Sequence, residues 1–184
     1  MQEISPLPAV GRNDKKMKKL LLALVFISAL AIFGNAQKIN WMTLQEAVKL
    51  NETAPKKIFI DVFTDWCGWC KRMDQTTFRN EDVINYMNEN YYAVKLDAEM
   101  NDTIVFGGYT YINEGGKNGR KGTHQLAAAL LQGRLSYPSY VFMNEKNQIL
   151  TVAPGFMEAK NFLPVLKYIG SDAYLNQSYN DFIK

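Results

Sequence analysis

The sequence contains few of the side chains that hold metal ions, since its 184 residues include two cysteines and one histidine. A structural zinc site usually takes four nitrogen or sulfur ligands, so we expect no bound metal. A nucleotide-binding phosphate loop is also missing, because no Gly-Lys-Ser/Thr follows the glycine-rich stretch 107–122 at the required spacing. These absences leave the two cysteines as the most informative residues.

Long apolar runs and an excess of one charge are missing as well. The run of small and apolar residues 20–33 has 14 members, whereas a membrane-spanning helix needs roughly 20. Residues 1–36 hold five of the 21 basic and two of the 18 acidic residues, which leaves 16 of each in residues 37–184. Nucleic-acid-binding domains are usually basic, so we expect no nucleic-acid partner. We also expect no membrane span in residues 37–184.

The N-terminal segment has the three parts of a secretory signal peptide. Four lysines within residues 15–19 precede the apolar run, and Gly34 and Ala36 place small residues where a signal peptidase cleaves. No cysteine follows the run, which argues against a lipid-modified N-terminus. The segment therefore predicts export of the protein.

We predict a signal peptide over residues 1–36, with Met17 as an alternative start, and a single domain over residues 37–184. Cleavage is expected after Ala36, with Ala31 as a second choice. The predicted location is the periplasm or the cell exterior, and an uncleaved membrane anchor is the alternative.

The apolar periodicity of residues 37–184 predicts an α/β domain. Strand followed by helix and strand favours a parallel crossover, whereas the short connection 144–148 favours an antiparallel hairpin. We therefore expect a mixed sheet flanked by helices, with an irregular insert that ends at residue 123. The expected strands are 58–63, 91–97, 139–143 and 149–153, and the expected helices are 43–51, 70–78, 81–90, 124–132, 159–169 and 171–184.

Both cysteines lie in the motif Trp66-Cys67-Gly68-Trp69-Cys70-Lys71, where a buried strand passes into a helix. Residues three apart on the first helical turn are neighbours, so Cys67 and Cys70 are close enough to form a disulfide. The helix N-terminus stabilises a thiolate. We predict that an exposed Cys67 is the attacking nucleophile and that Cys70 resolves the mixed disulfide.

Other roles for this cysteine pair stay open. A purely structural disulfide would close a four-residue loop, which contributes about 2 kcal/mol in the chain-entropy account. A copper-handling pair is chemically feasible with Met73 nearby, although such carriers usually place a methionine where this chain has Asp65. Redox exchange explains the motif best.

The segment Ile58-Phe59-Ile60-Asp61-Val62-Phe63-Thr64-Asp65-Trp66-Cys67-Gly68-Trp69-Cys70-Lys71 resembles the active-site strand and helix of the thioredoxin superfamily. Tyr137-Pro138-Ser139-Tyr140-Val141-Phe142 is similar to its cis-proline turn, and Gly155 matches a glycine after its last strand. The resemblance covers most of residues 40–170. It implies a thioredoxin fold with an insertion before the cis-proline strand, and it is nearest to secreted bacterial thioredoxin-like domains.

The chain departs from typical thioredoxin between the cysteines, where Gly68 and Trp69 replace Gly-Pro. The intervening pair tunes the reduction potential, which ranges from about −270 mV in reductants to about −120 mV in oxidants. The direction of electron transfer is therefore not determined by the motif.

Two charged residues are expected to support the cysteines. Asp61 lies in a buried strand six residues before Cys67, so its pKa should be raised, which suits a base that takes the proton of Cys70. The resemblance implies the same role for Asp61. It also implies that Lys95, on the next strand, neighbours this acid.

The expected substrate contacts surround the cysteines. Trp66, Gly68 and Trp69 would supply an apolar contact surface. By the resemblance, a cis peptide bond before Pro138 would turn the backbone of Tyr137 outward, where an extended peptide can pair with it.

The remaining candidates have simpler interpretations. His124 is expected to take a surface or helix-capping role. The aromatic residues of the insert, Phe106, Tyr109 and Tyr111, could form either a flap over a substrate groove or a hairpin. Three basic residues of the insert are expected to be solvated loop charges; these are Lys117, Arg120 and Lys121.

The sequence therefore predicts a thiol–disulfide oxidoreductase that reduces or isomerises disulfides in exported proteins. It needs no cofactor, and its substrates are protein disulfides or thiols. The family resemblance implies a membrane thiol carrier as electron partner. The alternatives are a non-catalytic peptide-binding or chaperone module with the same fold, and a copper-handling protein.

Overall fold

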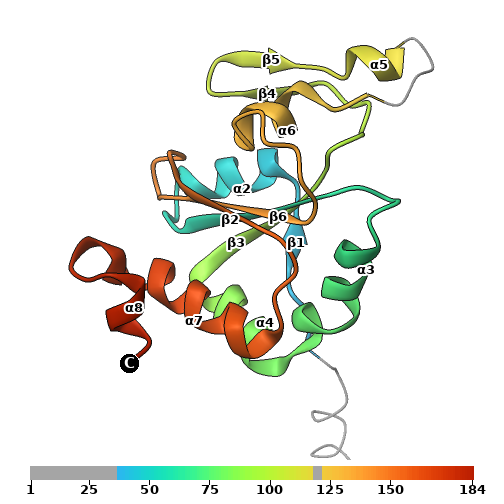
Figure 1. Cartoon of the computed structure of the whole chain (residues 1–184). Helices are drawn as coiled ribbons and strands as arrows, with labels where there is room; N and C mark the ends of the chain where they lie inside the picture. The colour runs from blue at the N-terminus through green and yellow to red at the C-terminus, as the bar shows by residue number, and fades with distance from the viewer. Residues whose placement is uncertain (1–36, 118–121) are drawn as a thin grey trace, which may run out of the picture. The chain divides into compact units, whose positions relative to one another are not determined.

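The computed structural model describes residues 37–117 and 122–184 (Figure 1). The predicted signal peptide over residues 1–36, and Arg120 and Lys121 of the insert, lie outside the described residues. Among the described residues, no helix combines the length and apolarity that crossing a membrane requires.

A five-stranded mixed sheet forms the centre of the domain, in the order β1-β3-β2-β6-β7. Strands β1, β3 and β2 run parallel, whereas β6 and β7 pair antiparallel. The predicted mixed sheet is therefore confirmed. Strand β1 was not predicted, because two residues are too few to show an alternating pattern. The strands are β1 (Trp41–Met42), β2 (Lys57–Phe63), β3 (Tyr91–Asp97), β6 (Ser139–Met143) and β7 (Ile149–Pro154).

Helices lie on both sides of this sheet, with α2 and α6 on one side and α4 and α7 on the other (Figure 1). A capping box begins α2, since the Thr43 hydroxyl accepts a hydrogen bond from the Glu46 amide and the Glu46 carboxylate accepts one from the Thr43 amide. The bounds are α2 (Leu44–Asn51), α3 (Gly68–Gln75), η2 (Thr77–Arg79), α4 (Glu81–Asn90), α6 (Gln125–Leu130) and α7 (Ala159–Gly170).

The predicted helix over residues 171–184 is wrong. This segment forms a short 3-10 helix, η3 (Ala173–Leu175), and a one-turn helix, α8 (Tyr179–Phe182). Asp172 takes a left-handed backbone conformation with φ of 60°, which stops α7 because a right-handed helix cannot continue through it. Ser178 then starts α8 by accepting a hydrogen bond from the Asp181 amide.

The alternating side chains of β2 supply both halves of the core. Ile58, Ile60 and Val62 pack on the side of α2 and α6. Phe59 faces the other side, where it stacks on Tyr140 with ring centroids 5.7 Å apart. Since residues two apart share a face, Asp61 lies on the Phe59 side, among aromatic rings. The carboxylate of Asp61 therefore lies in an apolar layer of the core.

The insert forms a hairpin and not a flap over the cysteines. Strands β4 (Ile104–Phe106) and β5 (Tyr109–Tyr111) pair antiparallel, and Gly107 and Gly108 between them have φ of 59° and 81°. Positive φ at both turn residues is the requirement of a type I′ hairpin, which glycine meets without strain. Phe106 and Tyr111 pack against the α2 and α6 half of the core. A short helix, α5 (Glu114–Lys117), follows β5.

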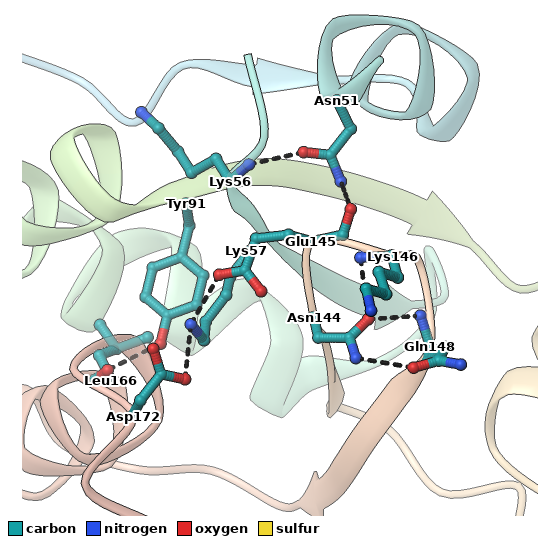
Figure 2. Close-up of polar contacts among 10 residues, drawn as sticks. All are labelled: Asn51, Lys56, Lys57, Tyr91, Asn144, Glu145, Lys146, Gln148, Leu166 and Asp172. Atoms are coloured by element: carbon teal, nitrogen blue, oxygen red, sulfur yellow. Dashed lines mark hydrogen bonds and ion pairs between the residues drawn. The ribbon is translucent and has the colours of Figure 1, made fainter. Parts of the chain in front are cut away.

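Lys57, at the start of β2, joins three parts of the domain (Figure 2). Its ammonium lies 2.8 Å from Glu145, in the β6–β7 turn, and 2.8 Å from Asp172, after α7. The Lys57 side chain is 4% exposed, and both carboxylates are about half exposed. Burial opposes the charge, but the hydrogen bonds to Asp172 and Glu145 outweigh it and raise the pKa of Lys57. The paired cation therefore ties the C-terminal segment to the sheet.

The double change Glu145→Gln and Asp172→Asn should destabilise the fold by about 2 kcal/mol, because it leaves a buried ammonium without a counter-charge. Urea unfolding at pH 7 measures the loss. Asp181→Asn is the matched control, because its partner Lys184 is exposed and such pairs contribute under about 1 kcal/mol. Equal losses in the two variants would contradict a structural role for the Lys57 cluster.

Candidate active site

The two cysteines lie where β2 passes into α3, and they form a disulfide with Cα atoms 5.3 Å apart. Cys67 is the N-cap of α3, and its sulfur accepts a hydrogen bond of 3.0 Å from the Cys70 amide. Amide groups in the first turn of a helix have no partner within the helix, so the sulfur occupies the place that a capping oxygen usually takes. This contact would also stabilise a thiolate at Cys67.

The expectation that Cys67 is exposed is wrong for this disulfide form. Cys67 is 4% exposed and Cys70 is 2% exposed. The sulfur of Cys67 is bonded to its partner and turned toward the first turn of α3, which removes it from solvent. Residues 66 and 69, one before each cysteine, are instead the exposed ones.

Asp61 and Lys95 form an ion pair between β3 and β2, the strand that leads to the cysteines. They occupy paired positions on β2 and β3, and the Lys95 ammonium lies 2.7 Å from Asp61 Oδ2. Asp61 is 1% exposed, and no described residue donates a hydrogen bond to its Oδ1. Burial raises the pKa of Asp61 from 3.8 to about 6, while the charge of Lys95 opposes this rise. The carboxyl can therefore exchange a proton near neutral pH.

The Lys95 ammonium has further neighbours that were not predicted from the sequence. It also bonds to Asp74 Oδ1 on α3. The ring centroids of Trp41, Phe63 and Phe78 lie 5.0, 5.0 and 5.3 Å from it, within the range of cation–π attraction. Asp74 could have been suspected from its position four residues after Cys70, which places both on one face of α3. The rings come from β1, β2 and η2, so only the fold assembles them.

Two exposed tryptophans lie beside the disulfide. Trp66 is 59% exposed, and its indole N–H donates a 2.9 Å hydrogen bond to Glu99. Trp69 is 60% exposed, and its ring lies 5.2 Å from that of Phe156. A groove of about 810 Å³ opens next to Trp69, and its lining residues are Gly68, Trp69, Arg72, Phe156 and Glu158. The exposed rings of Trp66 and Trp69 thus form an apolar surface around the cysteines, and its contact with a substrate stays a prediction.

The turn before β6 lies at the same end of the sheet. The Tyr137–Pro138 peptide bond is cis, and the Pro138 carbonyl accepts a 2.8 Å hydrogen bond from the Gly155 amide. Ser139 pairs with Val62 near the end of β2, so the turn is adjacent to the segment that leads to Cys67. The Tyr137 ring contacts Trp66 edge to face at 5.8 Å. Trp66, Tyr137 and Pro138 therefore form one surface.

His124 and Met73 are not available to a metal. His124 is fully buried; one ring nitrogen accepts from the Leu126 amide as the cap of α6, and the other bonds to the Asp102 carbonyl. The capping role is confirmed, and the surface alternative is wrong. Met73 is fully buried among apolar side chains. Across residues 37–117 and 122–184, no group of three or more potential metal ligands occurs.

A disulfide at the start of a helix, on a mixed sheet with helices on both sides, defines a thioredoxin-fold protein. The chain belongs to the Thioredox_DsbH family, described as "Protein of unknown function, DUF255", whose model matches residues 28–170. The resemblance to the thioredoxin superfamily and the predicted fold class are therefore confirmed.

Solved structures agree with this fold. A structure named DsbH Oxidoreductase superposes with a TM-score of 0.54 at 16% identity, covering 74% of this chain and 87% of that one. The solution structure of a candidate disulphide-isomerase from Bacteroides thetaiotaomicron superposes with a TM-score of 0.53 at 25% identity, covering 76% and 98%.

Curated relatives match shorter segments. An uncharacterized protein of Archaeoglobus fulgidus is 32% identical over 88 residues, which is 46% of this chain and 69% of that protein. The thiol:disulfide interchange protein DsbD of Campylobacter jejuni is 33% identical over 63 residues, 34% of this chain and 10% of that protein. Spermatogenesis-associated protein 20 of Rattus norvegicus is 36% identical over 55 residues, 30% and 7%. The chain thus spans only a small part of the last two proteins.

Asp61→Asn should stabilise the oxidised protein at pH 7. The folded protein holds the Asp61 proton more tightly than the unfolded chain does, so stability falls as pH rises from about 4 to about 6. A rise in pKa of this size corresponds to about 3 kcal/mol of folding stability that the wild type loses when Asp61 ionises. The amide of the Asp61→Asn variant does not ionise, so the variant does not lose this stability. Lys95 keeps Asp74 as a partner in this variant.

Urea unfolding at pH 4, 5.5 and 7 tests this expectation, with Asp82→Asn, an exposed carboxylate on α4, as the control. The gain should be near zero at pH 4 and largest at pH 7. An Asp61→Asn protein less stable than the wild type at pH 7 would show that the ion pair stabilises the fold.

Proposed function

We propose that this protein is a thiol–disulfide oxidoreductase that reduces or isomerises disulfides of exported proteins through Cys67 and Cys70. The observation that carries the proposal is the hydrogen bond from the Cys70 amide to the Cys67 sulfur at the start of α3. A negative charge on this sulfur is favoured by that amide and by the positive end of the helix dipole. A disulfide that only stabilises the fold does not require a location at the start of a helix.

In the reduced protein the Cys67 thiolate attacks one sulfur of a substrate disulfide. A mixed disulfide forms, and the other substrate sulfur leaves as a thiolate. The Cys70 thiol then loses its proton and attacks the Cys67 sulfur. This step breaks the mixed disulfide, releases the second substrate thiolate and leaves the Cys67–Cys70 disulfide, so two electrons have passed to the substrate. A dithiol donor returns them.

Asp61 is proposed to take the proton from Cys70. Its pKa of about 6 makes the carboxylate available at neutral pH and still basic enough to accept a proton. Its unpaired Oδ1 leaves one oxygen without a competing donor among the described residues. Lys95 holds the other oxygen and keeps the carboxylate in place.

The substrate is proposed to bind as an extended segment across the exposed face of the site. Trp66, Gly68 and Trp69 supply apolar contacts, and the backbone of Tyr137 beside Pro138 supplies strand-like hydrogen bonds. The exposed rings of Trp66 and Trp69 give apolar area, and the indole N–H of Trp66 is already paired with Glu99.

Export is proposed from the signal-peptide pattern of residues 1–36, with function in the periplasm or outside the cell. The electron donor is proposed to be the membrane thiol carrier that the family resemblance implies, and the similarity of 63 residues to a thiol:disulfide interchange protein supports exchange between thiols and disulfides. The reaction needs no cofactor, since thiols carry the electrons.

Reduction of insulin by dithiothreitol, followed by turbidity, tests the activity. Wild-type protein should shorten the delay before precipitation, and Cys67→Ser should lose at least about tenfold of this effect, because it lacks the nucleophile. Cys70→Ser should accumulate a mixed disulfide, detected by mass spectrometry. A wild type that is inactive at every concentration would contradict the proposal and favour a peptide-binding module.

Alkylation of the reduced single-cysteine variants tests the activated sulfur. In Cys70→Ser, the reaction of Cys67 with iodoacetamide should show a midpoint at least about one pH unit below the ordinary thiol value near 8.5, because the helix start favours the thiolate. Cys67→Ser is the matched control, and its Cys70 should react more slowly. A Cys67 midpoint equal to that of a free peptide thiol would remove the basis of the proposal.

A further inference from the structure

The buried Asp61 is connected to the surface through a second carboxylate. Lys95 bonds to Asp61 on one side and to Asp74 on the other. The side chains are 1% exposed at Asp61, 22% at Lys95 and 46% at Asp74. One cation is therefore shared by a buried carboxylate and a partly solvated one.

Asp74 belongs to the same helix as the cysteines. It follows Cys70 by about one turn of α3, so one rigid element carries both Cys70 and the second carboxylate that bonds to Lys95. Lys95 is also surrounded by the rings of Trp41, Phe63 and Phe78, which belong to other elements. The rings keep the ammonium in place whether or not Asp74 is charged.

We propose that Asp74 is a positioning residue of this site, which acts through Lys95 to keep Asp61 able to accept the proton of Cys70. The inference rests on the proposed function. Without Asp74, the full attraction of Lys95 would oppose the effect of burial more strongly and make Asp61 a weaker base. The second carboxylate divides the attraction of the cation, and its own negative charge disfavours ionisation of Asp61.

The other groups that face Asp61 do not supply this effect. Tyr140 pairs with Asp61 across β2 and β6, and its hydroxyl has no hydrogen-bond partner among the described residues. Burial and the charge of Asp61 raise the pKa of Tyr140, so the phenol stays neutral at working pH. Cys67 and Cys70 carry no charge as a disulfide. Burial raises the pKa of Asp61, Lys95 opposes the rise, and Asp74 adds to it.

Carboxyl NMR titration of Asp61 in the full-length oxidised protein tests the proposal. Asp74→Asn should lower the Asp61 midpoint by at least about half a pH unit, since Lys95 then acts on Asp61 alone. Asp74→Glu should restore it, because the longer acid still reaches Lys95. Asp82→Asn removes the same charge from α4 and should leave the midpoint unchanged.

The pH profile of insulin reduction is the second readout. Asp74→Asn should move its acidic limb to lower pH by the same amount and slow turnover at pH 7 by about twofold to fivefold, since a weaker base removes the Cys70 proton less readily. An Asp61 midpoint that does not move in Asp74→Asn would overturn the role of Asp74, even with an active wild type. An inactive wild type would overturn the proposed function, whatever the titration shows.

Discussion

Strand β2 is paired along both edges, and the candidate site depends on that register. Its pairing with β3 sets Asp61 opposite Lys95, and its pairing with β6 sets Asp61 opposite Tyr140. The same strand ends just before Cys67. A slip of one residue would turn Asp61 to the other face of the sheet and bring Ile60 toward the aromatic layer. The apolar side chains of β2 therefore fix the location of its one acid.

The charged side chains toward the two ends of β2 differ in how fully their neighbours compensate their charge. At its start, Lys57 is buried between two carboxylates, so the charge is fully compensated and the contact strengthens the fold. Toward its end, Asp61 shares one lysine with Asp74 and keeps an oxygen without a partner. Burial that Lys95 compensates only in part costs stability and raises the pKa of the carboxyl to about 6, which is the property that proton transfer requires.

Most of the secondary structure could be predicted because its signals are local. The buried strand 91–97 and the helix 81–90 have the bounds that their apolar patterns indicated. The failures came where few residues or a single backbone conformation decide the outcome. Two-residue β1 has no periodicity, and the left-handed Asp172 ended a helix that the composition allowed to continue.

Within the site, the cysteine motif could be predicted from the sequence, but the surroundings of the cysteines could not. Spacing alone predicted that Cys67 and Cys70 lie close together, since residues three apart on the first turn of a helix are neighbours. The burial of Cys67 and of His124 was not foreseen, because solvent exposure depends on what the rest of the chain packs over a residue. Asp74 was overlooked because its spacing from Cys70 shows only that both lie on one face of the helix, and not that Lys95 lies beside it.

The sequence by itself determined the cysteine pair, the buried acid before it and the mixed order of strands, because these follow from residue type and short-range spacing. Only the tertiary structure decided that Lys95 has two carboxylate partners and three aromatic neighbours, contributed by β1, β2, α3 and η2. The reason is physical: the proton affinity of Asp61 depends on burial and on charges a few ångströms away. Those distances exist only after distant segments have packed together.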